Sequence, residues 1–208
     1  MSSRHTVAEL LKALASVMAE GHLPWYLFGA QAAIIWGSPR LSADIDITAV
    51  IEPASVEAFV DTMTRHGFDV VFADSDFVAR TRVLPFVHQR TGVPIDIVLA
   101  GPGLEEDFLH RAICVDLEGT PISVISPEDL VITKVLAGRP KDIEDVRNVV
   151  HQRRASLDAE RIRNILQLLE RALGQSDLLP VFESAWLQDE SIEPPAAKRP
   201  TRKGRKKK

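Results

Sequence analysis

Residues 26–50, YLFGAQAAIIWGSPRLSADIDITAV, decide the fold expected for this chain. An apolar run ends at Gly29, a segment of small residues follows, and a Gly-Ser-Pro turn leads into the alternating sequence Asp-Ile-Asp-Ile at 44–47. Alternation of this kind predicts a strand with both isoleucines on one face and both carboxylates on the other. Asp44 and Asp46 are therefore expected to point to the same side of the strand.

Two carboxylates one strand repeat apart, about 7 Å along the backbone, repel each other unless a positive charge lies between them. A divalent cation can supply that charge, since Mg²⁺ is commonly held by one or two carboxylates while substrate phosphates fill its other positions. Two such ions can clamp both sides of an in-line phosphoryl displacement. The alternative for an isolated Asp-x-Asp is an exposed amphipathic strand with hydrated acids. The glycine, short helix and Arg-x-Ser that precede Asp44 favour the metal site.

The Gly-Ala pair at 29–30, the helix after it and the Arg-x-Ser-x-Asp-x-Asp run at 40–46 resemble a known signature. It is the first motif of the nucleotidyltransferase superfamily that includes DNA polymerase beta and the minimal nucleotidyltransferases. The Arg-x-Ser variant is similar to AbiEii-type toxin nucleotidyltransferases. In the superfamily a Gly-Ser pair opens a helix whose N-terminus binds nucleotide phosphates, whereas here Ala30 replaces the serine and removes one hydroxyl contact. The resemblance implies phosphate contacts by the residues ahead of the acids, which are Gly29, Ala30, Arg40 and Ser42.

A third acid is expected from residues 93–99, VPIDIVL, an apolar strand that contains Asp96. A single Asp within a buried strand is unfavourable unless it is paired or binds a metal. The superfamily places its third metal carboxylate on a neighbouring strand, and Asp96 stands in that place. The resemblance therefore implies that Asp44, Asp46 and Asp96 form the catalytic set and hold two Mg²⁺ ions, with Asp96 acting as ligand or base.

Residues 126–146, SPEDLVITKVLAGRPKDIEDV, begin with helix signals: Ser as cap, Pro at the first position and acids in the first turn. The segment resembles the C-terminal signature of the same superfamily, in which a helical lysine faces the triphosphate and a Lys-Asp-x-x-Asp helix follows. It implies that Lys134 is a phosphate ligand and places Lys141 and Asp142 in the nucleotide site. Asp142 and Asp145 match acids that are assigned either to catalysis or to holding Lys and Arg in place. Taken alone, Lys134 is also compatible with a helix lysine that extends its amine to solvent.

The remaining patterns predict an α+β protein with a mixed sheet, flanking helices and a C-terminal helical part. Periodicity predicts helices at residues 5–20, 56–66, 104–112, 159–173 and 177–187, and strands at residues 25–29, 44–50, 68–72, 77–84, 86–90, 93–99, 113–117 and 121–125. We expect a nucleotidyltransferase domain at residues 1–150, a helical extension packed on it at 151–190, and a disordered basic tail at 191–208.

Composition is that of an ordinary globular protein, with 208 residues of which 45% are hydrophobic and 26% charged. No apolar run approaches the roughly 20 residues of a membrane span, and the charged N-terminus does not resemble a signal peptide, so a cytoplasmic protein without membrane contact is expected. The single cysteine, Cys114, excludes a disulfide within the chain. Its place in a strand-like run predicts a buried thiol.

Charge is distributed unevenly along the chain. Eight of the 25 Lys and Arg residues lie at 198–208, whereas all 29 acids precede residue 194. The basic tail is compatible with an arm that binds RNA or DNA through its phosphates. It is equally compatible with a solubility segment, or with one that folds back on the acidic body.

These features predict Mg²⁺-dependent transfer of a nucleoside monophosphate from an NTP such as ATP to an acceptor hydroxyl. The acceptor stays open between RNA or tRNA, which the tail at 198–208 favours, a protein side chain, and a small hydroxylated compound such as an aminoglycoside. A second hypothesis is a catalytically silent nucleotide-binding or interaction module within a toxin–antitoxin pair. Ala30 favours that hypothesis and the three acids oppose it. An antitoxin protein is the partner that the toxin resemblance implies.

Overall fold

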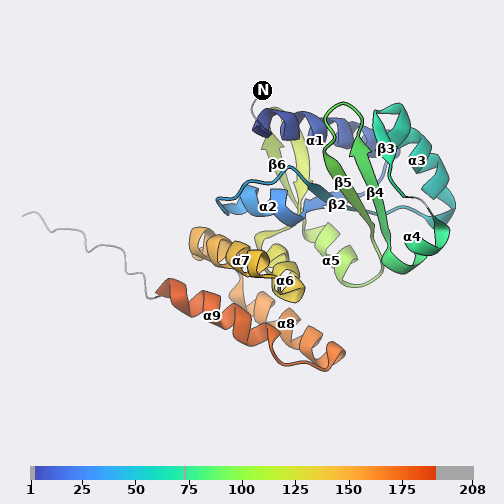
Figure 1. Cartoon of the computed structure of the whole chain (residues 1–208). Coiled ribbons are helices and arrows are strands. Elements are labelled where there is room, and N and C mark those ends of the chain that lie inside the picture. The colour runs from blue at the N-terminus through green and yellow to red at the C-terminus, as the bar shows by residue number, and fades with distance from the viewer. Residues whose placement is uncertain (1–2, 73, 191–208) are drawn as a thin grey trace, which may run out of the picture.

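The computed structural model describes residues 3–72 and 74–190, which form one seven-stranded mixed sheet surrounded by helices (Figure 1). The strand order is β3-β4-β5-β2-β1-β7-β6. The strands are β1 (Trp25–Phe28), β2 (Ile45–Ala49), β3 (Phe68–Val70), β4 (Val83–His88), β5 (Pro94–Leu99), β6 (Ile113–Leu117) and β7 (Thr120–Val124). The helices are α1 (Ser3–Glu20), α2 (Gly29–Trp36), α3 (Val56–Arg65), α4 (Ser75–Thr81), α5 (Leu104–Arg111), α6 (Pro127–Ala137), α7 (Pro140–Arg153), α8 (Ala159–Leu173) and α9 (Leu178–Glu190). The predicted α+β class with a mixed sheet is confirmed.

The acid-bearing strand β2 lies at the centre of the sheet. It pairs antiparallel with β1 and parallel with β5. Ile45 and Ile47 are fully buried in the core, and the intervening Asp46 is only half-buried. The β2–β5 register sets Asp46 directly beside Asp96. Because neighbouring strands lie about 4.8 Å apart, this register brings the backbones of the two acids close together.

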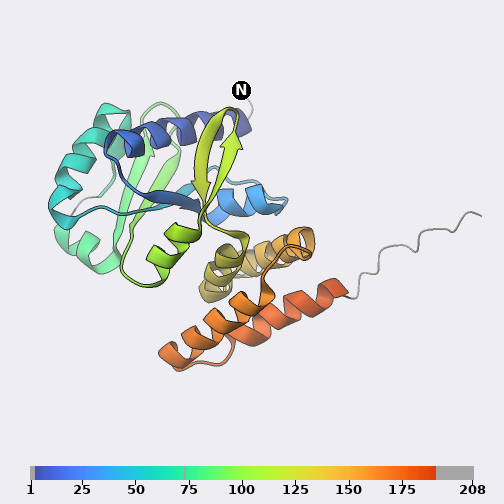
Figure 2. The ribbon, with the colours of Figure 1, turned by 180° about the vertical axis from the view of Figure 1, so that it is seen from behind.

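The short helix α2 connects the sheet to the helical part of the chain. It packs on β1 and β2 on one side and on α6 and α7 on the other. Its last residue, Trp36, donates an indole hydrogen bond of 2.8 Å to the carbonyl of Ile125. The helix ends at Gly37, whose φ of 118° is a left-handed conformation that glycine adopts without strain. In both views α6 and α7 lie between α2 and the α8–α9 pair (Figures 1 and 2).

The division into domains stays a prediction. Helix α7 runs through residue 150 without a break, so the polypeptide does not change its local structure at that boundary. Packing of α6 and α7 on α8 and α9 joins the predicted extension to the residues before it. The predicted tail at 191–208 lies outside the described residues.

Two sequence predictions on the β4 side were wrong in detail. Residues 77–84 form the end of α4 and the start of β4 rather than one strand. Asp74 caps α4 by accepting a hydrogen bond of 3.0 Å from the Phe77 N–H, and a helix of seven residues is too short for its periodicity to stand out. Strand β3 stops at Val70, two residues before the predicted end.

Cys114 is exposed, so the predicted buried thiol is wrong. It lies on β6, which is the edge strand of the sheet, and residues 113 and 114 of that strand are both exposed. Across residues 3–72 and 74–190, no helix combines the length and the apolar character that crossing a bilayer requires.

Candidate active site

A cavity of about 300 Å³ opens where β1 ends and where β2 and β5 begin. Every predicted site residue except Asp142 lines it. The lining consists of Phe28, Gly29, Ala30, Arg40, Ser42, Asp44, Ile45, Asp46, Pro94, Asp96, Lys134, Arg139 and Lys141. Residues from four distant parts of the chain therefore meet in one concave, strongly charged space.

Asp46 contacts the first turn of α2. Its carboxylate accepts a hydrogen bond from the Ala30 N–H. Gly29 has a φ of +64°, and a Cβ there would lie 2.6 Å from the Asp46 Cγ, so both backbone conformation and close approach require glycine. In this structure the amide that the superfamily resemblance assigns to phosphate is therefore engaged by an acid of the chain itself.

The three acids of the cavity disfavour one another's charge. Burial raises the pKa of Asp46, and the charges of Asp96 and Asp44 add to that rise, although the Ala30 hydrogen bond and Lys134 oppose it. Partial burial, followed by the charge of Asp44, raises the pKa of Asp96. Within the described part of the chain, none of the three forms an ion pair with Lys, Arg or His. Repulsion of this kind is relieved when a cation binds between the carboxylates.

The donor set fits a hard divalent cation, because three carboxylates face one cavity and Mg²⁺ prefers oxygen ligands. The side chains are not arranged as a closed metal site: across the described ranges, no three acidic, His or Cys groups are close enough to share one ion. The Asp46 carboxylate is instead directed at Ala30. Ligation by Asp44, Asp46 and Asp96 stays a prediction.

Contrary to the sequence prediction, Asp96 does not lie in a strand that is buried on both faces. Strand β5 is not buried on both faces, because Pro94 and Asp96 are exposed while Ile95 and Ile97 are fully buried. Asp96 is therefore only partly shielded from solvent, rather than enclosed in the core as expected of an acid in an apolar strand. Its position beside Asp46 follows from the parallel register of β2 and β5.

Lys134 on α6 is a buried cation held by two acids of α7. Its Nζ lies 2.8 Å from Asp142 Oδ1 and 2.9 Å from Asp145 Oδ2, and the residue is 6% exposed. Two carboxylates therefore balance its charge before any ligand binds. Lys134 lines the cavity, but a role as a phosphate ligand stays a prediction.

Asp142 does not line the cavity, and its place in the nucleotide site stays a prediction. The residue is fully buried and accepts hydrogen bonds from Lys134 and Arg139. Burial by itself raises the pKa of Asp142, but these two donors outweigh it and bring the pKa below its usual value. Of the two roles considered for this acid, the geometry is that of holding Lys and Arg in place.

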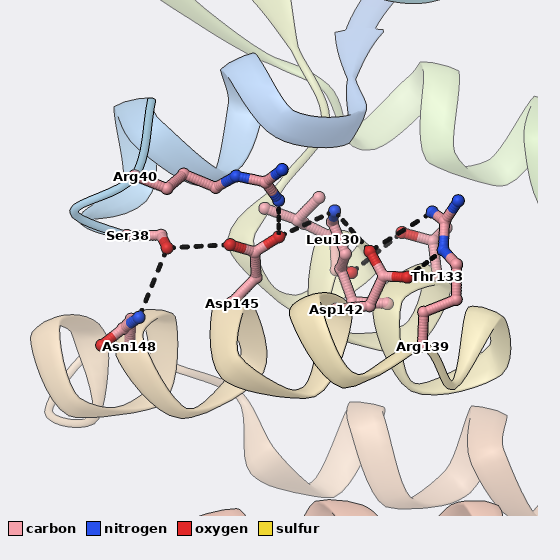
Figure 3. Close-up of polar contacts among 9 residues, drawn as sticks. Ser38, Arg40, Leu130, Thr133, Arg139, Asp142, Asp145 and Asn148 are labelled. Atoms are coloured by element: carbon pink, nitrogen blue, oxygen red, sulfur yellow. Dashed lines mark hydrogen bonds and ion pairs between the residues drawn. The ribbon is translucent and has the colours of Figure 1, made fainter. Parts of the chain in front are cut away.

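Asp145 ties the turn after α2 to α7 (Figure 3). It accepts a hydrogen bond of 2.8 Å from the Ser38 hydroxyl and forms an ion pair of 2.7 Å with Arg40. Asn148, one helical turn later, donates to the same hydroxyl at 3.4 Å. Arg40 is thus fixed at the rim of the cavity by an acid that is 2% exposed.

Sequence reasoning missed Ser38 and Arg139. Arg139 precedes Pro140 at the start of α7 and lines the cavity, with its side chain 61% exposed beside the buried Asp142. Its position next to a predicted helix start, together with an acid three residues later, was the available signal. Ser38 carried no signal of its own, because its partner Asp145 is 107 residues away.

The solved structures that resemble this chain show the same fold. The solution structure of the antibiotic-resistance factor ANT(2″)-Ia is 18% identical with a TM-score of 0.54, over 91% of this chain and 97% of that chain. An antigenic nucleotidyltransferase-like protein from Paracoccidioides brasiliensis is 13% identical with a TM-score of 0.54, over 87% and 92%. JHP933 from Helicobacter pylori is 13% identical with a TM-score of 0.51, over 92% of each chain.

Comparison with curated proteins gives no match. One family model matches residues 7–172, and its description is "Nucleotidyltransferase of unknown function (DUF6036)". The matched range includes every residue that lines the cavity.

Proposed function

Because this chain belongs to the nucleotidyltransferase family DUF6036, we propose that it transfers a nucleoside monophosphate from an NTP to an acceptor hydroxyl and releases pyrophosphate. One observation carries the proposal. Asp46 and Asp96 are paired across β2 and β5 inside a cavity that four cationic side chains also line. The carboxylates can hold a metal ion and the cationic side chains can hold a triphosphate, so this cavity suits both ligands.

Mg²⁺ would be held by Asp44 and Asp46, with Asp96 beside them, and when bound it would neutralise charge on the reacting phosphate oxygens. The chain itself supplies the remaining positive charge. Arg40 and Arg139 stand at the cavity and are oriented by the buried Asp145 and Asp142. Fixed cations of this kind stabilise charge that develops on a leaving pyrophosphate without having to reorganise.

Asp96 is the proposed base. The acceptor oxygen attacks the α-phosphorus, its proton passes to Asp96, and the bond between the α-phosphorus and the pyrophosphate oxygen breaks. The raised pKa of Asp96, caused by burial and by Asp44, makes it a better proton acceptor than an ordinary Asp.

Two acceptor classes have separate support. The eight basic residues at 198–208 favour RNA, since Lys and Arg clusters attract phosphate backbones. The resemblance to ANT(2″)-Ia, a structure of which contains adenylyl-2″-tobramycin, favours a small hydroxylated compound. A toxin of the AbiEii type with an antitoxin partner is a narrower form of the RNA proposal.

One observation favours a catalytically silent nucleotide-binding module instead. Ala30 lacks the serine hydroxyl, and its N–H is already bonded to Asp46. A triphosphate would have to displace Asp46 to use that amide. In a silent module NTP would bind, but no label would be transferred to any acceptor.

The test incubates the full chain with Mg²⁺ and each α-labelled NTP in turn, with cellular RNA in one arm and tobramycin in another. Asp46→Ala is the test variant, and Glu160→Gln, an exposed residue of α8, is the matched control. Label in either acceptor that disappears with Asp46→Ala and persists with Glu160→Gln supports the proposal and names the acceptor class. Undiminished labelling by Asp46→Ala overturns the site. Metal-dependent NTP binding without label in any fraction supports the silent module.

A further inference from the structure

A second cavity lies at the opposite ends of the two strands that carry the acids. Its volume is about 940 Å³, and it is bounded by the residues that follow β2 and β5 and by α3 and α4. We call it the α3–α4 cavity. It shares no lining residue with the candidate active site. Its lining consists of residues 50–53, 56, 57, 60, 61, 78, 79, 82 and 99–102.

The walls of the α3–α4 cavity are mainly aliphatic. Four valines line it, Val50, Val56, Val60 and Val78, together with Ile51 and Leu99. A concave space of this size with mostly apolar walls and a few polar groups has the character of a small-molecule site. Burying the apolar part of a ligand against such walls is favourable by about 25 cal/mol per Å².

The polar groups of the cavity are predominantly acidic. Glu52, Glu57 and Asp61 line it, and all three are exposed. Within residues 3–72 and 74–190, none of them takes part in a salt bridge or a side-chain hydrogen bond. Glu57 and Asp61 are four residues apart on α3, where like charges repel. A cation placed at this rim would relieve that repulsion.

Among the described residues that line the cavity, Arg82 is the one basic side chain, and it does not offset these acids. Arg82 ends α4 in a left-handed conformation with a φ of 56°, and its guanidinium reaches the end of β5. There it donates a hydrogen bond to the Leu99 carbonyl and lies 3.8 Å from Glu105. Its guanidinium is thus engaged by acceptors of the chain, and three carboxylates against one guanidinium leave the rim net negative over an apolar floor.

We propose that the α3–α4 cavity binds a small amphipathic amine, with the apolar body against the valines and the ammonium group at Glu57 and Asp61. Charge complementarity selects an amine over an acid of the same shape, because each unpaired carboxylate attracts the first and repels the second. The proposal is independent of the catalytic one, since the cavity shares no residue with the acidic site.

The test compares three probes with one carbon skeleton: 4-phenylbutylamine, 4-phenylbutanol and 4-phenylbutyrate. Binding to the full chain is followed by methyl NMR of the valines at pH 7, where an alkyl amine is charged. We expect shifts at Val56, Val60 and Val78, with the amine binding more tightly than the alcohol and the carboxylate binding most weakly. Exposed ion pairs are weak, so the advantage of the amine over the alcohol should be roughly 1.4- to 5-fold for each carboxylate, and roughly 2- to 30-fold for Glu57 and Asp61 together.

Two variants separate charge from location. Glu57→Gln combined with Asp61→Asn should remove most of the amine's advantage, whereas Glu160→Gln on α8 should preserve it.

Ala79→Trp adds a large side chain at an exposed lining position and should abolish binding of all three probes without unfolding the protein. Equal or tighter binding of the carboxylate, unchanged binding to Ala79→Trp, or shifts that map elsewhere would overturn the proposal. Valine shifts that depend on protein concentration in the absence of any probe would replace it with self-association at this cavity.

Discussion

Replacing Asp142 with Asn tests whether the buried acids of α7 hold the cations of the site. The substitution keeps the size of the side chain and removes its charge. Lys134, which is 6% exposed, would then keep one carboxylate, Asp145 at 2.9 Å, and lose the other at 2.8 Å. Arg139 would lose the acid that positions it.

The expected magnitude follows from burial. Removing one partner of a buried ion pair destabilises a protein by about 3–5 kcal/mol because the other charge is left uncompensated. Asp145 still compensates part of the Lys134 charge, and the Asn oxygen can still accept a hydrogen bond. We therefore expect a loss of about 2–3 kcal/mol in the free energy of unfolding. In a protein of this size that loss lowers Tm by roughly 4–12 °C.

The free energy of unfolding should depend on pH in a direction set by the pKa of Asp142. The folded-state pKa of Asp142 lies below its ordinary value, because donation from Arg139 and Lys134 outweighs burial. The charged acid therefore stabilises the fold above its unfolded pKa, and that stabilisation is lost as pH falls through the folded pKa. The difference between wild type and Asp142→Asn should be complete at pH 7 and should shrink below about pH 4.

Urea unfolding followed by circular dichroism measures these values. Glu20→Gln is the matched control, because it removes an acid from an exposed ion pair. Glu20 and Arg65 lie 3.5 Å apart, and their side chains are 47% and 64% exposed. A double-mutant cycle with Lys134→Met isolates the pair, and the double variant should be less destabilised than the sum of the single changes. A loss for Asp142→Asn no larger than that of Glu20→Gln, or a difference that does not change with pH, would refute the assigned role.

Three further substitutions test the acidic side of the cavity. Gly29→Ala should lower the free energy of unfolding by about 1 kcal/mol or more and weaken NTP binding, because its Cβ would meet the Asp46 carboxylate at a positive φ. Thermal unfolding unchanged from wild type would contradict this packing. Ala30→Ser should lower the Kd for NTP about 2- to 10-fold by restoring a hydroxyl donor, as measured by calorimetry with Mg²⁺, and an unchanged Kd would show that phosphate does not reach this turn. Asp96→Asn should raise Tm in EDTA, since repulsion with Asp44 and Asp46 falls, while Mg²⁺ should raise the Tm of wild type more than that of the variant. An Asp96→Asn protein that is less stable in EDTA, or equally stabilised by Mg²⁺, would count against the acidic cluster.

Local patterns in the sequence were enough for much of the fold. The alternation of Ile45 and Ile47 with Asp46 correctly predicts a strand whose isoleucines share one face, and that face is buried. Ser126 correctly predicts the start of α6, where its hydroxyl accepts the Asp129 N–H at 3.1 Å. Such features depend on neighbours within a few residues, which a sequence displays directly. The same reading failed at residues 77–84, where seven residues of helix are too few to be distinguished from partial alternation.

By itself, the sequence determined that the isoleucines of residues 45–47 share one face of their strand and that Asp46 lies on the other. Only the tertiary structure decided the partners of the site residues. The order of strands sets Asp96 beside Asp46, the packing of α6 on α7 encloses Lys134 between two acids, and the approach of β2 to α2 turns Asp46 onto the Ala30 amide. The α3–α4 cavity likewise exists only where α3 and α4 meet the ends of β2 and β5. Contacts of this kind join residues far apart in the chain, and their distances depend on strand register and helix packing, which no local periodicity encodes.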